Sequence, residues 1–313
     1  MDWLKNFPPE SRDFWKYTAE EIKDIQEIRI RAHRPVILYR NTEEYYLNLQ
    51  GRLTTGIEEG IVFSYEKIQR LVDYWCMDSR YAYQNQLKEG YLTLRGGHRI
   101  GICGEVVIKE GNYAETIKNI SGLNLRIAHE KKEAGTKLIG HLYREGELQN
   151  TLLIAPPGCG KTTLLRDLVR RISNGSEAGK GRNVGLVDER GEIAACFQGV
   201  PQLDIGLRTD VLTSCPKRIG MLTLLRSMGP QVIAVDELGG EEDVCSLRQI
   251  IGCGCTVLAT VHGRSIEELK QKKGIGDLIK ENVFSRFVIQ KKEGRFFRIQ
   301  LYGAGEEPVC CIS

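Results

Sequence analysis

The chain of 313 residues is longer than most single domains and long enough for two. Its 41% hydrophobic and 27% charged residues are typical of a packed globular protein and argue against intrinsic disorder. The net charge of +3, from 44 basic and 41 acidic residues, is too balanced to indicate nucleic acid as a partner by itself.

The ten cysteines lie mostly within apolar stretches, form no Cys-x-x-Cys pair and have no histidine at metal-ligand spacing. In a chain of this size, the pattern disfavours a disulfide framework and favours a reducing compartment. The first residues lack the features of a signal peptide, and no apolar run approaches the roughly 18 residues that span a bilayer. We therefore expect a cytoplasmic protein, with peripheral docking on a membrane complex left open.

Residues 1–130 are expected to form a small α+β domain. The patterns predict a helix after Pro8-Pro9, with Thr18-Ala-Glu-Glu21 in the form of a capping box, and a second helix over residues 65–76. They also predict strands at residues 25–32, 36–39 and 45–49, two strands joined by a turn at Gly96-Gly97, and a strand at residues 121–128.

Arg95, Arg99 and Arg126 lie on the later strands of this domain. Surface charge is the ordinary role of arginine, so these residues can form a solvated basic face. The alternative is that some of them point across a cleft at nucleotide phosphate. The sequence leaves both interpretations open.

A phosphate-binding loop follows a polar linker and short helix at residues 131–148. Residues 152–155 are apolar and predict a buried parallel strand, and residues 164–172 have apolar side chains at helical spacing. Between them, Ala155-Pro-Pro-Gly-Cys-Gly-Lys-Thr162 fits the Walker A pattern, with alanine at the position where the pattern usually has its first glycine. A glycine-rich turn is the alternative, but a strand before and a helix after are the context that a phosphate loop requires.

The residues of this loop have complementary roles toward a nucleotide. Glycines let the backbone curl so that successive N–H groups face one anion, and the helix N-terminus adds a partial positive charge. Lys161 is expected to reach the β- and γ-phosphates, and the Thr162 hydroxyl to ligate Mg²⁺. The loop residues expected to bind ATP are Pro157, Gly158, Cys159, Gly160, Lys161, Thr162 and Thr163.

Acidic residues follow two further apolar strands. Asp188 ends the strand at residues 183–188, and Glu189 follows it directly. Both lie where open α/β sheets bind ligands, at the carboxyl ends of the strands. Asp188 is therefore a candidate metal ligand and Glu189 a catalytic candidate, with helix-start capping as the alternative. Asp236 and Glu237 close the strand at residues 231–235 in Walker B form. Asp236 is expected to hold Mg²⁺ through water, and Glu237 to orient the attacking water.

The remaining elements complete an α/β pattern. The strand at residues 255–261 brings out His262, which is either a hydrogen-bonded turn histidine or a sensor that faces the γ-phosphate. Helices are expected at residues 221–228 and 241–251. A hairpin is expected from two alternating runs at residues 284–290 and 296–301, whereas residues 206–216 are interpreted as irregular and residues 308–313 as a frayed end.

The order of these motifs resembles the secretion ATPases of the type II and type IV systems, and within them a sporulation family of endospore-forming bacteria. The residues that carry the resemblance are the phosphate loop, Val187-Asp-Glu189, Val235-Asp-Glu237, Thr260-Val-His262 and the strand pair around Gly96-Gly-His-Arg99. The resemblance covers nearly all of the chain. It implies a RecA-like P-loop motor domain with a mainly parallel sheet at residues 149–313, behind the small α+β domain.

The resemblance also implies an activity, an assembly and partners. The chain would hydrolyse ATP with Mg²⁺ as a ring-shaped homo-oligomer, a hexamer. It would lie on the mother-cell side of the channel complex between mother cell and forespore, and the membrane proteins of that complex would be its partners.

Individual residues match the functional positions of this family. Val187-Asp-Glu189 matches its aspartate box, His262 its histidine box, and Arg226 the arginine just upstream of Walker B, a catalytic position. Arg99 and Arg126 match strand arginines whose relatives reach nucleotide from the N-terminal domain or from a neighbouring subunit.

Two other classes of function remain alternatives. RecA-like ATPases that bind nucleic acid, of the plastid single-strand-binding type, share much of this motor domain. Such a protein should show basic patches interleaved with stacking aromatics, of which Arg29, Arg31 and Arg34 with Tyr39 are a weak hint. A scaffold that binds ATP without hydrolysing it is disfavoured by the intact acids at positions 236 and 237. We therefore expect an ATP-hydrolysing motor.

Overall fold

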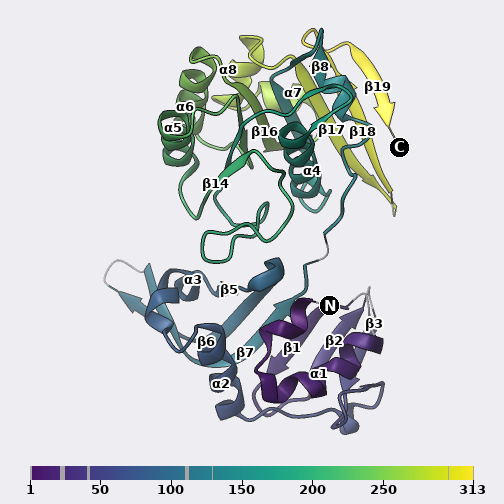
Figure 1. Ribbon diagram of the computed structural model, residues 1–313, viewed down its shortest axis with the longest axis vertical. Coiled ribbons are helices and arrows are strands. Elements are labelled where there is room, and N and C mark those ends of the chain that lie inside the picture. Colours follow the sequence, from purple (N-terminus) through teal and green to yellow (C-terminus); the bar gives the residue numbers. More distant parts are fainter. Residues whose placement is uncertain are drawn as a thin grey trace. The chain divides into compact units, whose positions relative to one another are not determined.

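The computed structural model describes residues 2–21, 25–40, 43–109, 113–128, 130–294 and 296–312. The chain forms two compact units, Met1–Glu130 and Lys131–Ser313, each with its own sheet (Figure 1). Each unit also has its own hydrophobic core. Among the described residues, no helix is long and apolar enough to cross a membrane.

The N-terminal unit is an α+β domain with one antiparallel sheet in the order β4-β3-β2-β1-β7-β6-β5. Its strands are β1 (Ile25–Arg31), β2 (Ile37–Arg40), β3 (Glu43–Leu47), β4 (Leu53–Thr54), β5 (Tyr91–Thr93), β6 (Arg99–Lys109) and β7 (Tyr113–Arg126). Its helices are α1 (Pro9–Glu21), α2 (Tyr65–Trp75) and α3 (Gln84–Lys88), with short 3-10 turns at Asp2–Asn6, Ile57–Glu59, Arg80–Tyr83 and Arg95–Gly97.

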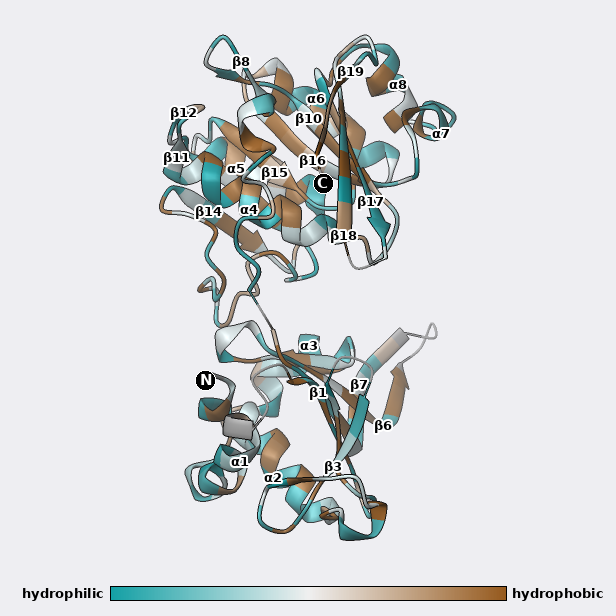
Figure 2. Ribbon diagram, turned by 90° about the vertical axis from the view of Figure 1, so that its right-hand side faces the viewer, coloured by the Kyte–Doolittle hydropathy of each residue, from teal (hydrophilic) through white to brown (hydrophobic). Residues whose placement is uncertain are grey.

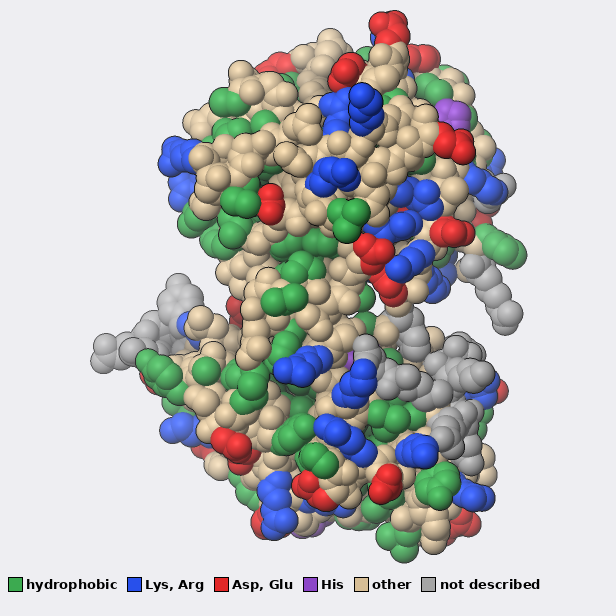
Figure 3. Space-filling view, viewed as in Figure 1, with side chains coloured by type: hydrophobic (Ala, Val, Ile, Leu, Met, Phe, Trp, Pro, Cys, Tyr) green, Lys and Arg blue, Asp and Glu red, His purple; other side chains and the backbone are tan. Residues whose placement is uncertain are grey.

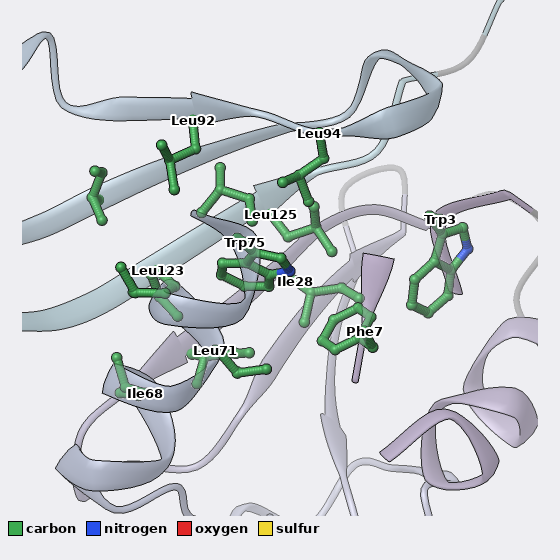
Figure 4. Close-up of a cluster of buried hydrophobic side chains, with 14 of the residues drawn as sticks. Trp3, Phe7, Ile28, Ile68, Leu71, Trp75, Leu92, Leu94, Leu123 and Leu125 are labelled. Carbon is green, nitrogen blue, oxygen red and sulfur yellow. The ribbon is translucent and has the colours of Figure 1, made fainter. Parts of the chain in front are cut away.

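Alternation along the strands gives this sheet one buried face. On β1, Ile28 and Ile30 are buried while Arg29 and Arg31 lie on the opposite face, as the period of two requires. Helix α2 buries Ile68, Leu71, Val72 and Trp75, which are spaced as one helical stripe. Figure 4 shows Ile68, Leu71 and Trp75 in one cluster with Leu123 and Leu125 of β7. Trp3 and Phe7 belong to the same core.

One local interpretation in this unit is wrong. The sequence places a capping box at Thr18, but helix α1 begins at Pro9, where a proline suits the first turn because its missing N–H has no partner there anyway. Thr18 lies inside the helix, is fully buried, and its hydroxyl donates to the Gly51 carbonyl at 2.8 Å.

The C-terminal unit is built on a mixed, mainly parallel sheet of eight strands in the order β14-β13-β15-β16-β10-β17-β18-β19. The six strands from β14 to β17 in this order are parallel neighbours, and β18 and β19 add antiparallel at one edge. The strands are β10 (Thr151–Ala155), β13 (Val184–Asp188), β14 (Thr209–Thr213), β15 (Val232–Val235), β16 (Thr256–His262), β17 (Arg286–Glu293), β18 (Phe296–Tyr302) and β19 (Pro308–Ile312). Small hairpins join β8 (Tyr143–Arg144) to β9 (Glu147–Leu148) and β11 (Gly175–Ser176) to β12 (Gly179–Lys180).

Helices cover both faces of this sheet. Helix α4 (Lys161–Asn174) and a 3-10 turn at Ile139–Leu142 pack on one face. Helices α5 (Lys217–Ser227), α6 (Glu241–Gly252), α7 (Ile266–Lys270) and α8 (Ile275–Lys280) pack on the other. The central strands are therefore apolar on both faces and appear brown in Figure 2. This three-layer α/β architecture confirms the fold class predicted from the sequence.

Two segments differ from the sequence-based prediction, one near the C-terminus and one at an edge of the sheet. Residues 308–313 were expected to fray, but Pro308–Ile312 forms β19, because Cys310 and Ile312 pack on the α4-side core. The stretch at 206–216 was interpreted as irregular, yet Thr209–Thr213 forms the edge strand β14. Both strands are only partly buried, which explains why their sequence patterns are weak.

The parallel arrangement brings residues that are distant in the sequence together at the carboxyl ends of the strands. The carboxyl ends of β10, β13, β15 and β16 meet there, and their last residues are Ala155, Asp188, Val235 and His262. In the register, Ala155 pairs directly with His262. The phosphate loop and both acidic pairs thus leave the sheet on the same side.

A buried ion cluster fixes the segment that precedes the sheet to helix α4. Asp167 is 2% exposed and accepts a hydrogen bond from the Gly135 N–H at 2.8 Å. It also pairs with Arg170 at 2.6 Å and Arg171 at 2.9 Å, each of which is less than one-fifth exposed. Since the charges are largely withdrawn from water, each partner depends on the others.

Replacement of Asp167 by alanine is expected to destabilise the C-terminal unit by about 2–4 kcal/mol, because two mostly buried arginines lose their counter-charge. The chain has three tryptophans, Trp3, Trp15 and Trp75, and all lie in the N-terminal unit. In urea, the transition followed by circular dichroism should therefore shift to lower denaturant while the tryptophan fluorescence transition stays in place.

The matched control is Asp204→Ala, which removes an exposed ion pair to Lys132, with 3.1 Å between the charged atoms, and an exposed hydrogen bond from the Gly206 N–H at 3.1 Å. It should change stability by about 1 kcal/mol or less. Equal effects of the two substitutions would contradict the importance given to the buried cluster.

Candidate functional site

The loop between β10 and α4 has the backbone geometry of an anion-binding turn. Gly158 and Gly160 have φ angles of +72° and +76°, a region that favours glycine. A Cβ on Gly160 would also lie only 3.3 Å from the Gln290 amide nitrogen and from the Phe297 ring. The 14-residue helix α4 begins at Lys161, so its N-terminal N–H groups and dipole face this turn.

Lys161, Glu237 and His262 form one cluster at the end of the loop. The Lys161 ammonium lies 3.2 and 3.3 Å from the two ring nitrogens of His262 and 3.6 Å from Glu237 Oε1. His262 Nε2 lies 2.6 Å from the same carboxylate oxygen. Burial lowers the pKa of Lys161, and the charges of Asp236 and Glu237 offset part of that effect. The structure therefore brings these three predicted site residues into mutual contact.

Glu237 is held in an unusual backbone conformation. Its φ is +51°, and a residue with a Cβ is strained there. Its N–H donates to the Thr260 hydroxyl at 2.8 Å, and the next N–H, of Leu238, donates to the Thr260 carbonyl at 2.8 Å. Arg190 Nη1 lies 2.8 Å from its second carboxylate oxygen. The turn thus directs the carboxylate into the cluster and away from the continuation of β15.

The Glu237 carboxyl is ionised over the physiological range. Burial alone would raise its pKa, but the nearby Lys161, His262 and Arg190 lower the pKa below the ordinary value for glutamate. A carboxylate held in this way can accept a hydrogen bond from water and orient it.

Thr162 and Asp236 meet at the adjacent position. The Thr162 hydroxyl lies 3.3 Å from Asp236 Oδ2, and the Thr260 hydroxyl donates to Asp236 Oδ1. Hydroxyl and carboxylate oxygens are the hard ligands that Mg²⁺ prefers, and a magnesium site commonly uses one or two of them with several waters. These two side chains therefore fit the expected Mg²⁺.

Asp188 organises a loop beside this cluster. It is 1% exposed, and its carboxylate accepts hydrogen bonds from the N–H groups of Glu192 at 2.9 Å, Ile193 at 3.1 Å and Ala194 at 2.9 Å. Burial raises the pKa of Asp188, the three N–H groups oppose that effect, and the charge of Asp236 adds to it. Both oxygens are thus engaged with the backbone of a loop, and because no helix begins among residues 189–208, the helix-start capping alternative is wrong. A metal-binding role for Asp188 stays a prediction.

Glu189 lies on the same loop and forms an ion pair with Lys217. Together with Asp188, Arg190, Asp236 and Glu237, these two residues line a pocket at the carboxyl edge of the sheet. Glu189 is therefore close to the acidic residues at the site, and its catalytic role stays a prediction.

Arg226 lies away from this cluster. Helix α5 follows β14 and precedes β15, so it runs antiparallel to both strands. It therefore ends near the amino-terminal ends of the strands, away from the phosphate loop. Lys217 is at the start of α5, beside Glu189, and Arg226 lies nine residues further along the helix, about 13 Å. Arg226 is exposed there. A role for it in nucleotide hydrolysis would require the site of another subunit.

Arg99 and Arg126 belong to the N-terminal unit, where they face each other in the register of β6 and β7. The Arg99 guanidinium stacks on Tyr91, 3.5 Å from the ring centroid. Arg126 Nε lies 3.5 Å from Glu27 Oε1. Their predicted role toward nucleotide stays a prediction.

Sequence reasoning missed three residues that the structure places at the site. In the sequence, Thr260 appears only as part of the histidine-box motif, yet its hydroxyl bridges Asp236 and the backbone of Glu237. Arg190 follows the first acidic pair directly, which is the one available signal, and Lys217 has no sequence signal at all.

Comparison with known proteins places the chain in a family. A family model described as sporulation stage III, protein AA, matches residues 9–305. Stage III sporulation protein AA of Bacillus subtilis (strain 168) is 40% identical over 265 residues, which cover 85% of this chain and 82% of that protein. The chain belongs to the stage III sporulation protein AA family.

Solved structures with the same fold include an ATPase and a pilus retraction motor. The ATPase DotB of Legionella pneumophila is 17% identical, with a TM-score of 0.59, and the match covers 95% of this chain and 81% of that one. The pilus retraction motor PilT, solved with bound ADP, is 15% identical, also with a TM-score of 0.59, covering 92% and 82%. At these identities the likeness establishes a shared fold and no more.

Replacement of Thr260 by valine is expected to lower the Mg²⁺-dependent ATP hydrolysis that the sequence predicts by about tenfold to a hundredfold. The substitution preserves shape but removes hydrogen bonds to Asp236 and to the strained Glu237 backbone. The rate of phosphate release at saturating ATP measures the effect.

The matched control is Thr256→Val. Thr256 lies on the same strand but at its amino-terminal end, away from the site. It should leave the rate within about twofold. A Thr260→Val protein with unchanged turnover would show that the hydroxyl does not hold the two acids in their working positions.

Proposed function

We propose that the chain is an ATP-hydrolysing motor of the secretion-ATPase type, acting in the channel complex between mother cell and forespore. The observation that carries the proposal is the contact of Lys161, Glu237 and His262 beside a phosphate loop, with Thr162 and Asp236 adjoining. Membership of the sporulation family and the fold shared with secretion ATPases support the setting.

Each side chain has a distinct task in this proposal. The loop N–H groups and Lys161 bind the β- and γ-phosphates. Thr162 and Asp236 would hold Mg²⁺, Asp236 through water, and the ion when bound neutralises phosphate charge. Glu237 orients the attacking water, and His262, 2.6 Å from it, positions the Glu237 carboxylate.

The assembly is a ring, a hexamer in which arginines from the N-terminal domain or a neighbouring subunit stabilise the transition state. The candidates for these arginines are Arg226, which lies near the amino-terminal ends of the strands, and Arg99 and Arg126 of the N-terminal domain. Loss of the γ-phosphate would release the N-terminal domain, and its movement would be transmitted to membrane proteins of the channel. The ring would dock peripherally on the mother-cell side.

Replacement of Glu237 by glutamine is expected to leave ATP bound but unhydrolysed, with a loss of turnover of at least about a hundredfold, because the amide cannot orient and activate water as the carboxylate does. Binding is measured by equilibrium titration of ATP and turnover by phosphate release.

Lys161→Ala is the comparison variant, and it should lose binding and turnover together. Rapid phosphate release from the Glu237→Gln protein would overturn the assigned role of Glu237. Wild-type turnover by the Lys161→Ala protein would exclude this loop as the nucleotide site.

The second candidate function is that of a RecA-like ATPase that binds nucleic acid. It is favoured by a groove of about 440 Å³ on the N-terminal unit, lined by Arg29, Arg31 and Arg34. The Arg29 guanidinium lies 5.4 Å from the centroid of the Tyr39 ring, but it is also paired with Glu27 at 2.9 Å. On the face of this unit shown in Figure 3, acidic side chains occur among the basic ones.

The two functions differ in what stimulates turnover. For a ring ATPase, the rate of phosphate release per chain should rise with protein concentration and be unchanged by single-stranded DNA. Measurement across protein concentration, with and without single-stranded DNA at low salt, makes the comparison. Stimulation by DNA at a fixed protein concentration would favour the second candidate.

A further inference from the structure

The hairpin of β17 and β18 extends beyond the phosphate loop. The register pairs Ile154 of β10 with Ile289 of β17, and β10 ends one residue later at Ala155. Strand β17 continues to Glu293, which pairs with Phe296 at the start of β18. The hairpin therefore extends about 10 Å beyond the level of Ala155.

Phe297 lies against the phosphate loop. On β18 it shares a face with Ile299 and Leu301, which pack in the core under helix α4. A Cβ on Gly160 would be 3.3 Å from Phe297 Cζ, so the ring edge contacts the turn that precedes Lys161. The side chain is nevertheless 38% exposed. Only part of the Phe297 ring therefore packs against the loop, and the rest is accessible to solvent.

Gln290 lies beside Phe297 on the same face. It is 6% exposed, its amide nitrogen would be 3.3 Å from a Cβ on Gly160, and its Oε1 has no hydrogen-bond partner among the described residues. A buried polar atom without a partner is costly, so it marks a position where a ligand atom would be stabilised. An aromatic face and an unpaired amide thus adjoin the loop on the side of β17.

We propose that Phe297 and Gln290 form the base-binding wall of the nucleotide site, and that the base is adenine. The inference rests on the proposed function, because it requires that the loop bind the phosphates. The ring of Phe297 stacks on the base. The Gln290 amide presents a donor and an acceptor side by side, which matches the exocyclic amine of adenine and its neighbouring ring nitrogen. Guanine presents two acceptors at that edge and does not match.

The test uses the full-length protein and three probes with Mg²⁺: ATP, GTP and inorganic tripolyphosphate. Phe297→Leu keeps apolar packing against the loop but removes the aromatic face. It should weaken ATP binding about tenfold or more and leave tripolyphosphate binding unchanged, because tripolyphosphate has no base. Phe297→Tyr should bind ATP like the wild type.

Phe296→Leu is the matched control. Phe296 is the adjacent residue of the same hairpin, it is 78% exposed, and alternation places it on the opposite face of the sheet. It should leave the affinity for all three probes unchanged. Gln290→Met, of similar size, should reduce the preference for ATP over GTP without affecting tripolyphosphate.

Three results would overturn the proposal: unchanged ATP affinity in Phe297→Leu, an equal loss of tripolyphosphate affinity in that variant, or an equal loss of ATP affinity in Phe296→Leu. The failure of the proposed function gives a different result. In that case the wild type binds neither ATP nor tripolyphosphate, or Lys161→Ala binds tripolyphosphate as well as the wild type does.

Discussion

The buried ammonium of Lys161 is the constraint on which the rest of the site depends. Its side chain is 5% exposed, and a charge withdrawn from water is costly unless opposite charges surround it. Glu237 lies 3.6 Å away, and the charge of Asp236 adds attraction. These acids follow β15, whereas Lys161 follows β10, so the compensation exists only when the parallel sheet forms. The fold and the site are therefore specified by the same strand order.

The positions of the acids depend in turn on β16. Thr260 binds Asp236 through its hydroxyl and receives the N–H of Glu237. The left-handed backbone at Glu237 costs on the order of 1 kcal/mol or more, and these hydrogen bonds hold it. The strain has a direct use, because it turns the Glu237 carboxylate back toward Lys161 and His262. A relaxed, extended residue at this position would continue along the strand direction.

The sequence was sufficient for features that depend on neighbouring residues. The phosphate loop has its strand before it and its helix after it, and the acids follow apolar strands, so their convergence at one sheet edge could be predicted. Thr260, Arg190 and Lys217 could not be assigned, because their contacts depend on register and on loop paths between strands. The same holds for β19, whose pairing with β18 is supported by long-range packing of Cys310 and Ile312. Thr18 matched a local capping pattern but is needed for a tertiary hydrogen bond to Gly51.

In the proposed mechanism, the positive side chains that bind the nucleotide differ from the one that accelerates its hydrolysis. Phosphoryl transfer spreads negative charge over the equatorial oxygens and is accelerated by a cation that arrives with the transition state. In the described part of the C-terminal unit, Lys161 and Arg190 both pair with Glu237, and Arg226 lies at the opposite edge of the sheet. In the proposed mechanism the groups that bind the phosphates thus lie within one unit, and we propose that the additional cation comes from a neighbouring subunit. Under the proposed function, such a protein would bind nucleotide as a single chain and hydrolyse it efficiently only in an assembly, which is the physical reason for proposing a ring.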